Sequence, residues 1–475
     1  MKYQPVKLAL PKGRFLSSIA KLLDEVGLDF ANYHEKTRQY SLNSTNFPHL
    51  SAKVFQEKDI PIQVAVGNYD LGICGLDWIE ELQARYPASA LVKIANLDYG
   101  KGSIYVAAGN QLGISRLDGL PGQDAYRIVS EYPNIAEALA LNLRMREFKI
   151  FPVWGDAEIY PPENADLAIL WQSDKSNLEA EGLISLAELF PVTAYLIACR
   201  KSLENKDLSQ ILARLRSRFT RYDTVVETRE FSKHSQHILK VVSTDWQAKK
   251  IKLALPDGHQ HRPTSQFLKQ AGFHFQGYSE KLTNRRPIAD LHWLGVKVIR
   301  PQDMPLQVAN GNFDLAITGK DWLLEHLCRF PSSPVEELLN LDFGKVKIVV
   351  AVSQGMPVND IDELRSLVQT GTLTPIRVAS EYTNIADKYL RDNHINPYKL
   401  IPTWGASEAF LPDDADLLID NTQTGKTLAQ QQLKIIDVLF QSSACLIGNK
   451  TNIGLPGKKE KVESLIQAFQ EAKSQ

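Results

Sequence analysis

The chain contains two related copies of one sequence, and this duplication constrains its fold more than any other feature. The run Leu8–Gly13 (Leu-Ala-Leu-Pro-Lys-Gly) recurs as Leu253–Gly258 (Leu-Ala-Leu-Pro-Asp-Gly), 253 − 8 = 245 positions later. The run Ser130–Ala136 recurs as Ser380–Ala386, 380 − 130 = 250 positions later, and other shared motifs lie between these in the same order. The repeat is about 240 residues long, whereas a solenoid stacks units of about 20–45 residues. The sequence therefore predicts a tandem duplication of one globular unit.

Each copy alternates short apolar runs with helical patterns, which is typical of an α/β fold. In the first copy we expect strands at Val6–Leu10 and Asp166–Leu170, and helices at Ser17–Val26 and Ile135–Leu143. A late strand at Val192–Ala198 is expected to return the chain from a second lobe to the first. We predict a first unit at residues 1–220, a polar linker at 221–249 and a second unit at 250–475.

Composition excludes several classes of partner. The net charge is −1, so the overall electrostatics favour neither a nucleic acid nor a membrane. No stretch is apolar and long enough to span a bilayer, and the N-terminal residues lack the apolar centre of a signal peptide. The four cysteines include no Cys-x-x-Cys pair, which argues against a zinc site or a disulfide framework. We expect free thiols, a cytoplasmic location and no metal site built by the protein alone.

The stretch Ala415–Leu428 has the composition of a cradle for a phosphorylated sugar. An apolar run carrying Asp416 and Asp420 ends in a threonine-rich loop, where Gly425 permits a tight turn. The threonine hydroxyls and the ammonium of Lys426 can donate to phosphate oxygens. The two carboxylates would repel a phosphate, so they suit the hydroxyls of a sugar.

A helix is expected after this loop, from Thr427 through Leu433, and N–H groups at a helix start favour an anion. Two other interpretations compete with this one. The tail Gly425-Lys426-Thr427 fits the nucleotide P-loop G-x-x-x-x-G-K-[ST], but Asp420 stands where that motif requires its first glycine. An ordinary turn in which Asp and Thr cap a helix stays open from this stretch alone.

Taken together, these motifs make each copy resemble ATP phosphoribosyltransferase, the first enzyme of histidine biosynthesis, in its short form without a C-terminal regulatory domain. The motifs that carry the resemblance are Ala9–Arg14, Val298–Pro305, Asp314–Asp321, Leu341–Lys345 and the loop Asp416–Thr427, which matches the family's phosphoribosyl pyrophosphate loop. The resemblance implies an α/β fold of two tandem copies of a two-lobed unit, similar to a type II periplasmic binding protein. It also implies a reaction that joins N1 of ATP to C1 of phosphoribosyl pyrophosphate and releases pyrophosphate, with Mg²⁺ accompanying the substrate.

The resemblance also implies which residues act. For phosphoribosyl pyrophosphate they are Glu408, Asp416, Asp420, Asn421, Thr422, Thr424, Gly425, Lys426 and Thr427. For ATP they are Lys12, Arg14, Asp314, Thr318 and Gly319. The expected catalytic cations are Arg300, Lys12, Arg14 and Arg38. An adenine nitrogen is already a nucleophile, so fixed cations and alignment of the substrates can supply the catalysis.

The two copies differ at these positions. Where the second copy has Asp420, Thr424, Gly425 and Thr427, the first has Leu170, Asp174, Lys175 and Asn177. Leucine cannot accept from a ribose hydroxyl, an aspartate repels phosphate, and lysine lacks the freedom of glycine in a tight turn. We therefore expect that the first loop does not hold phosphoribosyl pyrophosphate.

The cations show the opposite asymmetry. The first copy has Lys12 and Arg14 where the second has Asp257 and His259. Conversely, the second copy has Arg300 where the first has Gln56. Because each copy has lost different groups, we expect one composite site per chain, inside an internal pseudo-dimer that can assemble further. A regulatory subunit resembling histidyl-tRNA synthetase is implied as a partner. The alternative is a catalytically silent nucleotide- or phosphosugar-binding homologue with a regulatory role; a solute receptor is disfavoured by the missing signal peptide.

Overall fold

The computed structural model describes residues 4–30, 32–34, 40–114, 116–117, 120, 125–216, 250–455 and 457–474. The predicted linker 221–249 lies outside these residues. The described residues form mixed α/β structure that divides into two compact units. The segment Trp154–Ile159 is counted with the second unit, and Trp404–Ala409 with the first. No helix of the described residues has both the length and the apolar character needed to cross a membrane.

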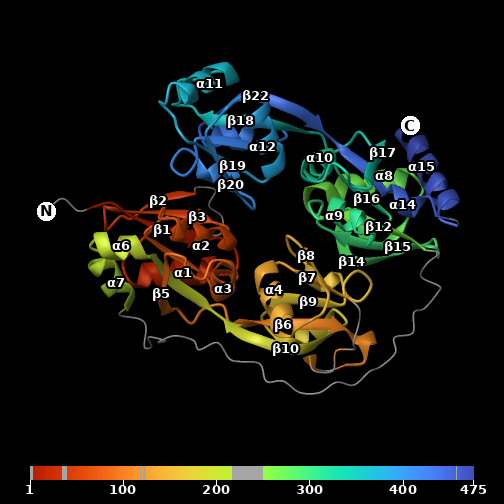
Figure 1. The fold of residues 1–475 in the computed structure, drawn as a ribbon, viewed down its shortest axis with the longest axis horizontal. Helices are drawn as coiled ribbons and strands as arrows, with labels where there is room; N and C mark the ends of the chain where they lie inside the picture. Colours follow the sequence, from red (N-terminus) through yellow and green to blue (C-terminus); the bar gives the residue numbers. More distant parts are fainter. Residues whose placement is uncertain are drawn as a thin grey trace. The chain divides into compact units, whose positions relative to one another are not determined.

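The first sheet of the first unit has six strands and is mostly parallel at its centre (Figure 1). Its spatial order is β2 (Ser41–Asn43), β3 (Leu50–Phe55), β1 (Val6–Pro11), β4 (Leu71–Gly75), β11 (Ala194–Cys199) and β5 (Leu91–Asn96). Strand β1 pairs in parallel with both β3 and β4. Strand β11 lies antiparallel between β4 and β5, which confirms the predicted return strand.

The second sheet of this unit is built by the chain between β5 and β11. Its order is β10 (Leu183–Val192), β6 (Gly102–Gly109), β9 (Leu167–Gln172), β7 (Tyr126–Ser130) and β8 (Phe148–Pro152). The helices of the unit are α1 (Leu16–Glu25), α2 (Ile60–Ala65), α3 (Leu76–Arg85), α4 (Pro133–Asn142), α5 (Lys175–Ala180), α6 (Arg200–Asn205) and α7 (Ser209–Arg216).

The second unit repeats this plan. One sheet has the order β15 (Leu294–Ile299), β12 (Ile251–Pro256), β16 (Leu315–Gly319), β23 (Ala444–Asn449) and β17 (Val335–Asn340). The other has the order β20 (Tyr398–Pro402), β19 (Ile376–Ser380), β21 (Leu417–Thr422), β18 (Val346–Ser353) and β22 (Leu433–Ser442). A separate antiparallel pair is formed by β13 (Phe275–Ser279) and β14 (Leu282–Ala289). The same strand order in both units, apart from the edge strand β2, agrees with a duplication.

The helices of the second unit follow the strands in the same sequence as those of the first. They are α8 (His261–Gln270), α9 (Met304–Ala309), α10 (Lys320–Arg329), α11 (Ile361–Gln369), α12 (Thr383–Asp392), α13 (Lys426–Gln430), α14 (Lys450–Ile453) and α15 (Lys459–Lys473). Only α11 occupies a stretch whose counterpart in the first copy is mainly outside the described residues.

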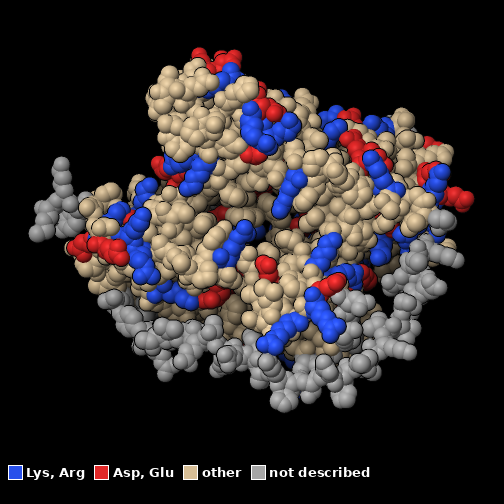
Figure 2. Space-filling view, viewed as in Figure 1, with Lys and Arg blue, Asp and Glu red and all other residues tan. Residues whose placement is uncertain are grey.

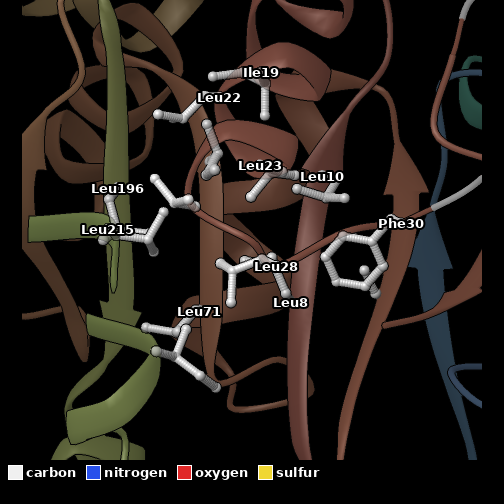
Figure 3. Close-up of a cluster of buried hydrophobic side chains, with 14 of the residues drawn as sticks. Leu8, Leu10, Ile19, Leu22, Leu23, Leu28, Phe30, Leu71, Leu196 and Leu215 are labelled. Atoms are coloured by element: carbon white, nitrogen blue, oxygen red, sulfur yellow. The ribbon is translucent and has the colours of Figure 1, made fainter. Parts of the chain in front are cut away.

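The core of the first sheet explains why α1 forms where it does. Its buried residues Leu16, Ile19, Leu22 and Leu23 are spaced three or four apart, so they line one helix face. Figure 3 shows Leu22 and Leu23 close to side chains from the strands, with which they form one buried cluster. Truncating a buried leucine in such a cluster costs about 2–5 kcal/mol of stability. The predicted helix at Ser17–Val26 is confirmed, shifted by one residue.

Within each unit, a glutamate on the helix after the first sheet contacts the start of a helix of the second sheet. Glu81 of α3, which follows the first sheet, accepts the N–H groups of Asn134 and Ile135 at the start of α4, each at 2.9 Å. Glu325 of α10 makes the same pair of contacts with α12 at 2.9 Å. Burial raises the pKa of Glu81 to about 7, while the N–H donors lower it. The contact satisfies N–H groups at the helix start that would otherwise lack partners.

Candidate functional site

The loop between β21 and α13 is built around Gly425. Its φ of 73° lies in the left-handed region, which glycine adopts without steric cost. The Gly425 N–H donates to the hydroxyl oxygen of Thr422 at 2.9 Å. The last residue of the strand therefore closes the turn, and a side chain at position 425 would strain it.

The helix predicted from Thr427 to Leu433 is shorter than expected, and the prediction of its end is wrong. Helix α13 ends at Gln430, and Leu433 already begins β22. Between them Gln432 has a φ of 54°, and a left-handed residue of this kind ends a helix. Five residues align few peptide dipoles, so hydroxyls and N–H groups of the loop must supply most of its affinity for an anion.

The loop presents three side-chain donors to solvent. Thr424, Lys426 and Thr427 are exposed, and within the described residues no hydrogen bond or ion pair engages their side chains. Two hydroxyls and an ammonium beside a tight turn suit the oxygens of a phosphate group, because hydrogen bonds to ionised acceptors are the stronger ones.

Asp416 lies at the other end of this strand and has a partner. Its carboxylate forms a two-pronged ion pair with Arg377, with distances of 2.7 and 3.1 Å, and accepts the Arg377 N–H at 2.8 Å. In the first unit Asp166 and Arg127 make the same contacts at 2.8 and 3.3 Å. An arrangement present in both units supports the strand, so contact of Asp416 with a substrate stays a prediction.

Asp420 and Asn421 end β21 side by side. The backbone N–H of Asn421 donates to the Asp420 carboxylate at 2.7 Å, and its side-chain amide approaches the same oxygen at 3.3 Å. The amide also donates to the hydroxyl of Tyr382 at 3.0 Å. The carboxylate is therefore held at the start of the loop, next to the exposed donors.

The first unit closes the corresponding loop with an ordinary helix cap. Asp174 precedes α5, and its carboxylate accepts from the N–H of Ser176 at 2.8 Å and from its hydroxyl at 2.6 Å. These hydrogen bonds lower the pKa of Asp174. The Asp174 carboxylate thus accepts hydrogen bonds from the N–H and hydroxyl groups that a phosphate would need as donors.

Arg14 of the first unit is held by carboxylates. It donates to Asp77 at 2.6 and 2.8 Å and to Glu57 at 2.9 Å. Its guanidinium carbon also lies 4.5 Å from the ring centre of Trp171. Burial disfavours the charged form of Arg14, but the two carboxylates outweigh it and raise the pKa of the guanidinium. Burial raises the pKa of Glu57 to about 7, although Arg14 lowers it.

Lys12 is more accessible than Arg14. Its ammonium lies 5.5 Å from the ring centre of Tyr40, and no ion pair in the described part of the chain engages it. Glu408, which is counted with the first unit, raises the pKa of Tyr40 as a secondary cause after burial. Lys12 and Glu408 therefore both lie near Tyr40. Arg38 lies outside the described residues.

Arg300 is placed in the second unit at the end of β15. Its Nε donates to Asp156, of the segment Trp154–Ile159, at 3.1 Å. Arg285 contacts the same carboxylate at 2.6 Å and Asp257 at 2.9 Å. The two arginines therefore share Asp156, and 38% of the Arg300 side chain stays exposed.

The three residues expected to bind ATP in the second unit are buried around β16. Asp314 forms an ion pair with Lys458 at 2.8 Å and accepts the N–H of Lys252 at 3.0 Å. The Thr318 hydroxyl donates to the carbonyl of Pro301 at 2.9 Å, and Gly319 caps α10. These contacts support the fold, and a role with ATP stays a prediction for all three.

Charge and metal ligands give no competing site. On the face drawn in Figure 2, Lys and Arg are interspersed with Asp and Glu. Within the described ranges, no group of three or more His, Cys, Asp or Glu side chains is arranged to hold a metal ion. The loop after β21 remains the best-formed candidate.

Comparison with known sequences decides the family. The family model of ATP phosphoribosyltransferase matches residues 56–217 and 300–471, one region in each copy, and together these exceed half of the chain. The chain belongs to the ATP phosphoribosyltransferase family.

Relatives in this family are similar over the length of about one copy. The ATP phosphoribosyltransferase of Prosthecochloris aestuarii is 33% identical over 227 residues, which is 47% of this chain and 71% of the relative. The enzyme of Saccharolobus solfataricus is 38% identical over 205 residues, 42% of this chain and 64% of the relative. Among solved structures, the ATP phosphoribosyl transferase (HisG:HisZ) complex from Thermotoga maritima matches 45% of this chain and 97% of that chain, with 20% identity and a TM-score of 0.37.

Two residues near the loop, Asp321 and Tyr382, have no role in the sequence-based prediction. Asp321 ends the motif Asp314–Asp321, which carries the family resemblance, and Tyr382 lies in the repeated run Ser380–Ala386. In the structure the Tyr382 hydroxyl donates to Asp321 at 2.7 Å. The signal that could have found them is that both residues recur in the first copy, as Asp77 and Tyr132.

Proposed function

We propose that the chain is an ATP phosphoribosyltransferase that performs the first step of histidine biosynthesis. Membership of the family in both copies carries this proposal, and the open, donor-rich loop of the second copy supports it. In the reaction, the lone pair of adenine N1 forms a bond to C1 of phosphoribosyl pyrophosphate. The bond from C1 to the pyrophosphate oxygen breaks, and its electrons leave with pyrophosphate.

The second unit's loop is proposed to bind the phosphorylated sugar. Thr424, Lys426 and Thr427 would donate to the 5-phosphate, and the left-handed turn at Gly425 keeps space for it. Asp420 would accept from the ribose hydroxyls, as a carboxylate fixed by neighbouring N–H groups can do. Holding the sugar in one orientation aligns C1 for attack, which is worth several kcal/mol of barrier.

Cations are proposed to stabilise the departing pyrophosphate. Lys12 and Arg300 are the proposed groups, because each copy has lost a cation that the other keeps. Arg14 is a weaker candidate, since two carboxylates already engage it. Arg38 stays a sequence-based proposal. Mg²⁺ bound to the pyrophosphate would share this task, since a metal ion screens the leaving charge.

The arrangement of the whole chain is also part of the proposal. We propose two tandem, two-lobed units of the periplasmic-binding-protein type, supported by the two sheets and the return strand of each unit. We further propose one composite site per chain, a cytoplasmic location, and a regulatory subunit resembling histidyl-tRNA synthetase. The proposal of a regulatory subunit rests on the resemblance to the short-form family.

The direct test mixes purified chain with ATP, Mg²⁺ and phosphoribosyl pyrophosphate and follows product absorbance and pyrophosphate release. Turnover that requires both substrates supports the proposal. Absence of turnover, both alone and with the regulatory subunit added, would refute it.

A pair of variants tests the composite site. Lys12→Ala and Thr424→Ala are each expected to abolish turnover, although they lie in different copies. Asp174→Ala, at the position of Thr424 in the first copy, is the matched control and should leave turnover unchanged. A silent Lys12→Ala would exclude the composite site but not the activity.

A further inference from the structure

A chain of four hydrogen-bonded side chains runs behind the loop of the second unit. The Ser442 hydroxyl donates to one oxygen of Asp321 at 2.7 Å, and the Tyr382 hydroxyl donates to the other at 2.7 Å. Tyr382 in turn accepts from the side-chain amide of Asn421 at 3.0 Å. Ser442, Asp321 and Tyr382 are at most 4% exposed, so water does not compete for these contacts.

This chain connects both sheets of the unit to the loop. Asp321 lies in the first turn of α10, directly after β16 of the first sheet. Tyr382 precedes α12, and Ser442 and Asn421 end strands of the second sheet. The orientation of the Asn421 amide is thus fixed by three residues, which come from α10, from the start of α12 and from β22. The buried hydrogen bonds among Ser442, Asp321 and Tyr382 hold the Tyr382 hydroxyl in one position.

The direction of each hydrogen bond follows from charge. Burial, together with Asp321 and Asp420, raises the pKa of Tyr382. The Tyr382 hydroxyl therefore stays protonated and donates a hydrogen bond to Asp321. The hydroxyl oxygen can then only accept, and the NH₂ side of the Asn421 amide must face it. The amide oxygen of Asn421 accepts no hydrogen bond within the described residues, which leaves it as an acceptor beside the Asp420 carboxylate.

The first unit keeps part of this chain and lacks the rest. Tyr132 donates to Asp77 at 2.7 Å, as Tyr382 does to Asp321. However, Trp171 stands where the second copy has Asn421, and Val192 stands where it has Ser442. Arg14 takes the remaining capacity of Asp77. The retained tyrosine therefore supports the fold of the first unit but reaches no loop residue able to accept from a sugar.

We propose that Tyr382, Asp321 and Ser442 are positioning residues that hold Asn421 beside Asp420, so that the two side chains together receive the ribose hydroxyls of the phosphorylated sugar. This inference rests on the proposed function of the loop. Tyr382 should therefore affect the binding of the phosphorylated sugar and leave the binding of ATP unchanged.

The experiment compares Tyr382→Phe with Tyr132→Phe. Both tyrosines pack at 4.5 Å between ring centres against a tryptophan, Trp322 or Trp78, and both donate to a buried aspartate. Both variants therefore lose the hydrogen bond to the aspartate and should lose similar thermal stability, whereas only Tyr382→Phe also loses the contact with Asn421. Binding of phosphoribosyl pyrophosphate is measured by calorimetry, and the KM for each substrate by turnover.

Loss of one buried, oriented hydrogen bond should weaken binding of phosphoribosyl pyrophosphate about tenfold in Tyr382→Phe. The KM for ATP should stay within about twofold, and Tyr132→Phe should bind like the wild type. In an Asn421→Ala background, Tyr382→Phe should add nothing, because the tyrosine acts through the asparagine.

Equal binding by the two phenylalanine variants would overturn the inference, as would a full effect of Tyr382→Phe in the Asn421→Ala background. Binding separates this inference from the proposed function. A chain that binds the sugar through Tyr382 without turning over would keep the inference and refute the enzyme. A wild-type chain that does not bind the sugar would overturn both.

Discussion

The loops after β9 and β21 occupy the same place in the two units, yet they are closed in different ways. In the first unit, Asp174 caps α5 with its own carboxylate, and Trp171 packs on the guanidinium of Arg14. In the second unit, Gly425 makes the turn without a side chain. In the first loop Ser176 and Asn177 donate to neighbouring side chains of the loop, whereas the second loop leaves its hydroxyl donors exposed.

After the duplication, the residues that support the strand before the loop and the residues of the loop itself changed independently. The ion pair between Asp416 and Arg377 survives in the first unit as Asp166 and Arg127, because it supports a strand in both. The loop residues proposed to hold the phosphorylated sugar have no such constraint, and Asp420, Thr424, Gly425 and Thr427 all differ from their counterparts in the first copy. A residue shared by both units is therefore a poor candidate for substrate contact.

Exchanging the loop residues should have the largest effect. Thr424→Asp combined with Gly425→Lys gives the second unit the residues of the first, and should lower kcat/KM for phosphoribosyl pyrophosphate about 1000-fold. A carboxylate repels the phosphate, and lysine is strained at a φ of 73°. Steady-state kinetics measure the change.

The reverse exchange is the control. Asp174→Thr with Lys175→Gly in the first unit should leave kcat/KM unchanged, because Trp171 still packs where Asn421 would be needed. A rise in activity from the reverse exchange, or survival of activity in the forward one, would break the comparison.

The cores of the two units should respond alike. Leu8→Ala and Leu253→Ala remove equivalent buried side chains, 0% and 1% exposed, and each should lower the free energy of unfolding by about 2–5 kcal/mol. Urea unfolding followed by circular dichroism measures both. If only one variant is destabilised, the two units do not share one packing scheme.

A smaller effect is expected at the sugar. Asp420→Leu, which introduces the residue of the first copy, should raise the KM for phosphoribosyl pyrophosphate about 30-fold, because the lost acceptor is charged. The KM for ATP should change little. Leu170→Ala in the first unit is the control, and it should affect stability but not either KM.

The smallest effect concerns pH and is confined to the first unit. Glu57 has no counterpart in the second copy, where Pro301 stands. Its pKa is about 7 in the folded chain against an ordinary value of 4.5, so the unfolded state loses the proton first as pH rises. Its contribution to stability is complete below about pH 4.5 and is lost as pH rises through 7.

The measurement is the difference in free energy of unfolding between wild type and Glu57→Gln across this window. The wild type should lose about 1–2 kcal/mol more than the variant between the two pH values. Identical pH profiles would show that Arg14 keeps Glu57 ionised throughout, in spite of its burial and of the neighbouring Asp77 carboxylate.

The sequence predicted what depends on local pattern. Apolar periodicity located α1 and β1, repetition indicated the duplication, and Gly425 marked the turn. The partners of Arg14 could not be found this way, since Glu57 and Asp77 lie 43 and 63 positions away. The end of α13 was missed because Gln432, an ordinary helix former, adopts a left-handed φ that only tertiary packing selects.

The return strand of each unit makes the second sheet a contiguous insertion. Asn96 at the end of β5 is paired with Tyr195 of β11, and Asn340 of β17 with Cys445 of β23. A short peptide joining Asn96 to Ala194 would therefore remove the whole second sheet while leaving every strand of the first sheet with its neighbours. One recombination event at these two points would delete or exchange that sheet as a single segment.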